Sequence, residues 1–210
     1  SVITLYAQWR PVTYYISYNN TTSTRATATL KSTYKVNDSA DGRYVLPELT
    51  RNNYKFLGWY ESKEDAKNAV DLATGMTTLD ELGLTKETKP AAVTEISPAN
   101  YQEMLTPNGS RQYIYLYAAM QPYTYTVTYD LNAENDKTVS LGDNNKTGKP
   151  YVSGQMYEID KTYQFAVASR NGFRFDYWTV NADGSGNRYG AHTNFRNLKV
   201  AEGHPDFKVY

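Results

Sequence analysis

The side chains best suited to catalysis or metal binding are few in this sequence. It contains two histidines, His192 and His204, and no cysteine. A hydrolytic triad combines a histidine with a nucleophile and an orienting side chain, and most zinc sites combine several histidine or cysteine ligands. The two histidines lie twelve positions apart on different predicted segments, and we interpret both as loop residues facing solvent. Their positions predict neither a triad nor a metal pair.

One segment spaces its oxygen-bearing side chains as a calcium-binding loop does. In "DGSGNRYGAHTN", Asp183, Ser185 and Asn187 stand at positions one, three and five. The twelfth position is Asn194, whereas an EF-type loop requires a bidentate glutamate there. A glycine-bearing turn between two strands explains the same letters, and we favour that interpretation. We therefore expect no metal and no cofactor.

Carboxylates gather in one polar stretch of the chain. Paired carboxylates can hydrolyse glycosides when a cleft holds them a few ångströms apart. Here they alternate with Lys63 and Lys67, a pattern typical of a solvated helix face. We predict that the protein is not an enzyme, and we keep an enzyme with buried carboxylates in this stretch as an alternative. The carboxylates concerned are Glu61, Glu64, Asp65, Asp80 and Glu81.

The composition indicates a β-rich chain and argues against two classes of partner. Lys plus Arg and Asp plus Glu number 22 each, so the chain lacks the net positive charge that attracts nucleic acid or an anionic membrane surface. No run approaches the roughly 18 apolar residues of a membrane span. The chain has 21 tyrosines, and aromatic residues favour strands.

The elements that would position any site recur along the chain. "PVTYYISYN" from Pro11 returns as "PYTYTVTYD" from Pro122, and "RNNYKFLGW" from Arg51 returns as "RNGFRFDYW" from Arg170. A third phrase follows in the same order each time. Repetition in a fixed order is the sequence signature of tandem modules.

The third phrase is a closing strand. It reads "ITLYAQWRP" from Ile3, "IYLYAAMQP" from Ile114 and, in short form, "FKVY" from Phe207. We therefore divide the chain into a closing-strand remnant at 1–10, a first module at 11–121 and a second module at 122–210.

Alternating aromatic residues predict strands that face a core. Val12, Tyr14, Ile16 and Tyr18 recur at period two, which places them on one face of a strand. Tyr123 begins the equivalent set in the second module, and Phe173, Phe175 and Tyr177 alternate in the same way in its third strand. An aromatic platform for a ligand is the alternative interpretation. The predicted core anchors are Tyr14, Ile16, Tyr18, Phe56, Trp59, Leu116, Val127, Tyr129, Phe175, Trp178 and Val209.

The first module carries an insertion at about 61–110. Leu116 follows Trp59 by 57 positions, whereas Val209 follows Trp178 by 31. The insertion contains "SKEDAKNAV" and "SPANYQEML", the second with a serine placed as an N-cap and a proline at the first helical position. These signals predict short helices.

The recurring pieces resemble the Listeria-Bacteroides repeat, also called the internalin-type B repeat. The resemblance rests on "YTVTYDLN" from Tyr125, "GFRFDYW" from Gly172, "NADGSGNRYGAHTNF" from Asn181 and "ITLYAQW" from Ile3. The second module is similar throughout. The first is similar at both ends and at "YKFLGWY", but not in the insertion, and Met120 stands where the family has its closing tryptophan.

The resemblance implies an α+β, β-rich fold of tandem β-grasp-like, ubiquitin-like small domains. It implies an extracellular stalk or interaction module on a bacterial cell surface or cell wall, adhesin-like and without catalytic residues. The partners would be a host or bacterial surface protein or a glycan, and the modules would be monomeric within a longer chain. An internal isopeptide bond, known in some bacterial surface domains, is left open.

Two further expectations concern binding. The alternative function is a carbohydrate-binding accessory region of a secreted glycanase, which would require solvent-facing tyrosines or tryptophans in a row. The remnant at 1–10 is an orphan strand, and such strands seek a sheet to join. We expect it to dock along an edge of the first module or to pair with another molecule.

Overall fold

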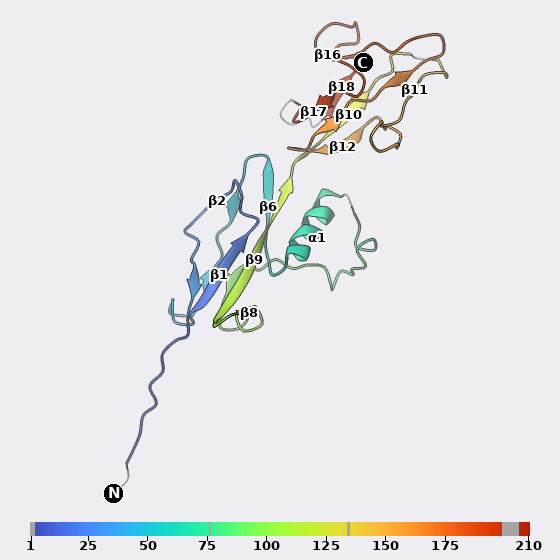
Figure 1. The fold of residues 1–210 in the computed structure, drawn as a ribbon. Helices are drawn as coiled ribbons and strands as arrows, with labels where there is room; N and C mark the ends of the chain where they lie inside the picture. Colours follow the sequence, from blue (N-terminus) through green and yellow to red (C-terminus); the bar gives the residue numbers. More distant parts are fainter. Residues whose placement is uncertain (1–2, 76, 134, 199–205) are drawn as a thin grey trace. The chain divides into compact units, whose positions relative to one another are not determined.

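The computed structural model describes residues 3–75, 77–133, 135–198 and 206–210 (Figure 1). The chain divides into two compact units, unit one at residues 1–121 and unit two at residues 122–210. His204 lies outside the described residues. Each unit is built around its own hydrophobic cluster.

Unit one is organised by a sheet in which the first and last strands lie side by side. Strand β1 (Tyr14–Asn19) pairs in parallel with β9 (Arg111–Pro122) and antiparallel with β3 (Thr33–Tyr34). Strands β6 (Tyr54–Tyr60) and β8 (Leu105–Asn108) also pair with β9. The long β9 therefore has partners along both of its halves.

Period-two alternation explains how this sheet separates its two faces. In β9, Ile114, Leu116 and Ala118 are buried in the main core cluster of unit one. Tyr113 and Tyr115 alternate with them in the sequence and so point to the opposite face. We call this opposite side the outer face.

Two short ladders complete the core side of unit one. The side chains of Tyr44, Leu46, Leu49 and Ile96 are buried against the sheet in the same cluster. The ladders are β2 (Arg25–Ala26) with β5 (Leu49–Thr50) and β4 (Tyr44–Val45) with β7 (Glu95–Ile96).

A single helix, α1 (Lys63–Thr74), covers part of the outer face (Figure 1). The hydroxyl of Ser62 caps its start by accepting from the Asp65 amide at 3.0 Å, and Gly75 ends it with a φ of 70°. Both are common helix-terminating arrangements. Ala66 packs with Ala119. Within the described residues, no helix has the length and apolar character needed to cross a membrane.

Unit two repeats the strand order of unit one in smaller form. Strand β10 (Thr124–Tyr129) pairs in parallel with β18 (Asp206–Val209) and antiparallel with β12 (Gln155–Glu158). Three ladders surround this sheet. They are β11 (Ser140–Leu141) with β14 (Ala168–Ser169), β13 (Tyr163–Gln164) with β17 (Asn194–Phe195), and β15 (Trp178–Thr179) with β16 (Arg188–Tyr189).

Most of the extra residues of unit one lie between its tryptophan and the residue that pairs with that tryptophan. Trp59 bridges Val93, which follows it by 34 positions, whereas Trp178 pairs with Tyr189 after 11 positions. The longer path contains α1. The helix thus belongs to a segment that unit two largely lacks.

The expected β-grasp-like α+β fold is wrong. The described part of the protein is β-rich, with one helix of 12 residues and many small sheets. A grasp fold needs a helix crossing the sheet in every module, but the described residues of unit two contain none. Many strands have only two residues. The described strands therefore form several short ladders separated by turns, and they do not join into one continuous sheet.

The predicted core anchors fall into two groups. Tyr14, Tyr18, Phe56 and Phe175 are half-buried beside the cores. The remaining anchors are buried, namely Ile16, Trp59, Leu116, Val127, Tyr129, Trp178 and Val209.

Three details differ from the sequence interpretation. Val12 and Tyr123 precede the opening strands and are exposed, so neither lines a core. Phe173 is also exposed, at 66%. The stretch "SPANYQEML" forms consecutive turns from Pro98 instead of a helix, because the following strand β8 begins at Leu105 and leaves little room.

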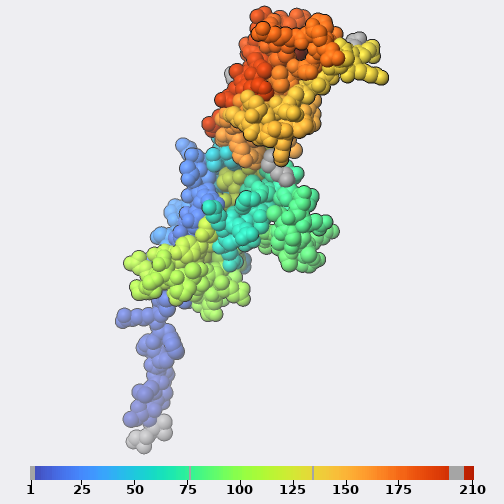
Figure 2. Space-filling model, turned by 45° about the vertical axis from the view of Figure 1, so that its right-hand side comes forward, coloured from blue at the N-terminus to red at the C-terminus, as the bar shows by residue number. Residues whose placement is uncertain are grey.

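Residues 3–13 form no strand, and the large side chains of Ile3, Leu5, Tyr6 and Trp9 are 80–89% exposed (Figure 2). The expected docking of this segment on an edge of the first module is not found. Pairing with another molecule stays a prediction.

Candidate functional site

The side chains singled out for possible chemistry mostly serve local structure. His192 has a φ of 57° in a turn, and its Nδ1 lies 3.4 Å from the hydroxyl of Tyr151. The carboxylate of Asp183 accepts from the amide and hydroxyl of Ser185 at 2.9 and 2.6 Å, which lowers its pKa. Its segment connects β15 to β16 as a turn. Among the described residues, no group of three or more possible ligands is placed to hold a metal.

The carboxylates of the polar stretch also act locally. Asp65 accepts from the Ser62 hydroxyl at 2.7 Å in the cap of α1. Glu81 accepts from the amide of Thr78 at 2.9 Å and from the hydroxyl of Thr77 at 3.1 Å, and these bonds lower its pKa. These contacts hold turns and helix ends, and they do not form a paired acid and base.

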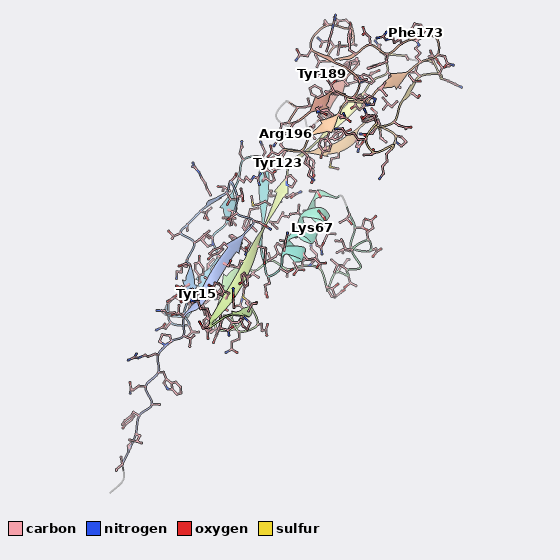
Figure 3. All side chains as sticks on the ribbon, in the orientation of Figure 1. Tyr15, Lys67, Tyr123, Phe173, Tyr189 and Arg196 are labelled. Atoms are coloured by element: carbon pink, nitrogen blue, oxygen red, sulfur yellow. The ribbon has the colours of Figure 1, made fainter. Side chains whose placement is uncertain are left out.

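Unit two contains a groove of about 430 Å³ beside residues 173–179, which we call the Phe175 groove. Leu131, Phe175 and Trp178 supply its apolar surface, and Tyr210 lies where β18 ends. The rings of Phe175 and Trp178 pack 5.1 Å apart. Figure 3 labels Phe173 at the surface of this unit.

An ion pair stands at one rim of the groove. Arg170 Nε lies 2.8 Å from Asp136 Oδ2, and its guanidinium stands 4.3 Å from the centre of the Phe173 ring. Hydrogen bonds from Thr138, and then from Arg170, lower the pKa of Asp136. The arginine charge is therefore matched by a carboxylate at the rim.

A second ion pair stands near Tyr210. Lys208 Nζ lies 2.9 Å from Asp130 Oδ2 and 4.5 Å from the centre of the Tyr210 ring. The contact lowers the pKa of Asp130 and raises that of Lys208. Arg174, Asp176 and Asp183 also line the groove, so it offers charged groups beside its apolar surface.

The backbone beside the groove is open, whereas the same segment of unit one is paired. The equivalent residues there form the seven-residue strand β6, which pairs with β9. In unit two, Thr179 and Tyr210 exchange both backbone hydrogen bonds, at 2.9 and 2.8 Å. Among the described residues, no strand continues this pairing along residues 174–177.

Unit one carries a second feature, a cluster of tyrosines on the outer face of its sheet. The rings of Tyr15 and Tyr113 lie 5.4 Å apart, and those of Tyr113 and Tyr115 are stacked at 5.7 Å. Arg111 stands 4.6 Å from the Tyr15 ring, and Asn108 Nδ2 donates to the Tyr115 hydroxyl at 3.2 Å. We call Tyr15, Tyr113 and Tyr115 the tyrosine row; Tyr15 is labelled in Figure 3.

The helix leaves the tyrosine row uncovered. Helix α1 packs on Tyr117, the next outward tyrosine of β9, in a separate small cluster. The three rings of the row are half-buried. The sequence interpretation gave these residues no role. Tyr113 and Tyr115 alternate with Ile114 and Leu116 in the sequence, and this alternation could have predicted that they lie on the opposite face of the strand.

Comparison with known proteins identifies one family. The family model of the Listeria-Bacteroides repeat domain matches residues 14–84. The match runs from β1 through α1 and extends into the segment that the sequence interpretation set apart as an insertion. No curated protein and no solved structure matches the chain.

Proposed function

We propose that the chain is a non-enzymatic, extracellular part of a bacterial cell-surface protein, because the family model of the Listeria-Bacteroides repeat domain matches residues 14–84. Repeats of this family occur in bacterial surface and extracellular proteins. In this proposal the two units form an adhesin-like stalk or interaction module. The family match is the observation that carries it.

The repeated architecture supports the proposal. Both units pair their opening and closing strands in parallel, and both surround a buried tryptophan with tyrosine and phenylalanine rings. Tandem copies of one small module extend a chain by repetition. The side chains available for acid–base chemistry hold turns and caps, which supports a role without catalysis.

Labelling of intact cells tests the location. An antibody raised against the 210-residue chain should label unpermeabilised cells of the source bacterium, and protease treatment of those cells should remove the signal. A cytoplasmic protein treated in parallel is the control for lysis. Labelling that appears only after permeabilisation contradicts the proposal. The encoding reading frame gives a second test, since a signal peptide, further copies and a wall anchor are expected in it.

A second candidate function is carbohydrate binding, and the tyrosine row favours it. Aromatic rings presented side by side on a sheet offer apolar faces for sugar rings, and Arg111 and Asn108 place polar groups beside them. Sites of this kind combine apolar surface with a few polar groups that orient the ligand. The sequence analysis asked for solvent-facing tyrosines in a row, and the structure has three half-buried tyrosine rings side by side on the outer face.

A glycan array distinguishes the two candidates. If the row binds sugars, the wild-type chain should retain particular glycans and the double variant Tyr113→Ala, Tyr115→Ala should lose them. Tyr123→Ala is the matched control because Tyr123 is 57% exposed and lies outside the row. Equal binding by the double variant would show that the tyrosine row is not the glycan site. If the wild-type chain binds no glycan at all, the stalk or interaction module is the only candidate function that remains.

A further inference from the structure

Arg111 brings a positive charge to the tyrosine row. It is exposed at the start of β9, and its guanidinium carbon stands 4.6 Å from the centre of the Tyr15 ring. Among the described residues, no ion pair includes Arg111, whereas Arg170 of unit two pairs with Asp136 at 2.8 Å. The outer face of unit one therefore presents a cation that an external anion can reach.

Strand pairing places polar and aromatic groups around this cation. Tyr113 stands opposite Tyr15 on β1 and opposite Thr106 on β8, and Asn108 stands opposite Arg111 itself. Residues directly opposite each other point to the same face of a sheet. The guanidinium thus shares the outer face with an amide, an aliphatic hydroxyl and phenol rings.

The groups of this face are held in place before any ligand arrives. The two-residue turn 109–110 joins β8 to β9, with a φ of 63° at Gly109, and keeps Asn108 opposite Arg111. Asn108 Nδ2 donates to the Tyr115 hydroxyl at 3.2 Å, so this hydroxyl can still donate its own hydrogen to a ligand. A face that is ordered in advance loses less conformational freedom on binding.

A sugar that carries a carboxylate matches this set of groups. The planar guanidinium of arginine binds a carboxylate through two parallel hydrogen bonds. Hydroxyls and amides orient a sugar while aromatic rings contact its apolar surface. A neutral glycan lying over Arg111 would remove water from a charge without giving it a partner, which is costly.

The balance of charges argues against a denser polyanion. Lys plus Arg and Asp plus Glu number 22 each, whereas binding to nucleic acid draws on many cations at once. One arginine among three tyrosines suits a ligand whose charges are spaced along neutral rings.

We propose that the tyrosine row binds an acidic polysaccharide built from carboxylated sugars, with the Arg111 guanidinium holding one carboxylate. Tyr113 and Tyr115 contact sugar rings further along the same chain. Four strand residues separate Arg111 from Tyr115, a span of about 13 Å, which is longer than one sugar ring. The carbohydrate-binding candidate is the premise here, and Arg111 adds the charge of the ligand to it.

Calorimetric titration of the 210-residue chain with oligosaccharides of hyaluronan, polygalacturonate and alginate tests the proposal. At least one of these carboxylated probes should bind. Arg111→Gln should weaken that binding about tenfold or more, as expected when a hydrogen bond to a charged group is lost. Arg25→Gln is the matched control, because Arg25 is also exposed but lies in β2, outside the row. It should leave the affinity unchanged, and thermal unfolding of both variants checks that they are folded.

Two altered probes separate the charge from the sugar. The bound oligosaccharide with its carboxylates converted to neutral methyl esters should bind the wild-type chain about as weakly as the acidic form binds Arg111→Gln. Poly-glutamate, which has carboxylates but no sugar rings, should bind weakly as well.

Several results would overturn the proposal, and they differ in what they leave standing. Equal binding of the acidic and esterified forms, lost in the double variant Tyr113→Ala, Tyr115→Ala, would keep carbohydrate binding and remove the preference for acidic sugars. Equal losses from Arg111→Gln and Arg25→Gln, or equal binding of poly-glutamate, would show nonspecific attraction of anions. Failure of all three carboxylated probes would overturn the proposal, and neutral glycans retained on the array would then still support the carbohydrate-binding candidate.

Discussion

The indole Nε1–H of Trp178 donates to the backbone carbonyl of Ala166 at 2.7 Å. In unit one, Trp59 donates in the same way to Pro47 at 2.8 Å, and both acceptors precede their tryptophan by twelve residues. Each indole therefore ties the aromatic segment of its unit to the turn before it. A buried indole N–H without such a partner would be costly.

We expect Trp59→Ala and Trp178→Ala each to lower the free energy of unfolding by about 3–5 kcal/mol, the usual range for a buried aromatic residue. Both tryptophans are almost fully buried, at 1% and 2% exposed. Trp→Phe at each site is the comparison, because it keeps most of the ring packing and removes the N–H donor. It should cost less. Urea unfolding followed by circular dichroism measures both, and losses below about 1 kcal/mol for the alanine variants would show that the rings do not support the core.

Gly58→Ala should destabilise unit one by about 1–3 kcal/mol, the range for a residue forced into a sparsely populated conformation. Gly58 has a φ of 136°, and an added Cβ would lie 2.6 Å from the Cβ of Ala92. Adding Ala92→Gly to this variant should remove the collision between the two Cβ atoms and restore part of the lost stability. The strain from the positive φ at residue 58 should remain. Gly109→Ala is the control, because Gly109 has a φ of 63° and open space around it. Thermal unfolding that ranks Gly109→Ala as more harmful would contradict this account.

A chain of residues 1–121 should fold without residues 122–210. Unit one has its own core cluster, which includes Ile16, Trp59 and Leu116. Its far-ultraviolet circular dichroism should show β structure and a cooperative thermal transition. A spectrum of an unfolded chain would show that unit one depends on unit two.

Alkaline pH should unfold the protein through its buried tyrosines. Burial raises the pKa of Tyr157 to about 12 and raises the pKa of Tyr18 and Tyr129 as well, whereas an unfolded tyrosine titrates near 10. Because the folded state favours the neutral phenol, this stability is complete below about pH 10 and is lost as the pH rises toward about 12. Phenolate absorbance and circular dichroism should therefore change together for the buried class.

Tyr157→Phe checks the cause of the alkaline transition. It should move the midpoint to higher pH, since the phenol that resists ionisation is gone. Tyr123→Phe, at an exposed position, should not move it. If buried tyrosines titrated near pH 10 without loss of structure, the burial argument would be wrong.

Local patterns predicted much of each core but not the extent of the sheets. The alternation around Ile16 and Val127 predicts strands, because a strand with one buried face needs an apolar residue at every second position. This pattern can be seen in the local sequence alone. The segments from Tyr54 and from Phe173 place phenylalanine and tryptophan at matching positions, yet only the first is a full strand. The first pairs with β9, which is distant in the sequence, and a local pattern does not record such a partner.

The binding features were harder to predict for a similar reason. Tyr113 and Tyr115 alternate as clearly as the core residues between them, but their exposure depends on how far α1 reaches across the outer face. The stretch "SKEDAKNAV" predicted a short helix there. That pattern does not show which tyrosines the helix leaves uncovered, and the Phe175 groove becomes visible only when the two units are compared.

The parallel pairing of first and last strands determines how a module responds to pulling. The chain enters unit one at the start of β1 and leaves at the far end of β9, and the two strands share five paired residues in parallel register. Tension along the chain therefore slides these strands past each other, so their hydrogen bonds carry the load together and do not open one after another. Unit two has the same geometry with four pairs. Built this way, each module resists extension along the chain, which is the load that the proposed stalk role would impose.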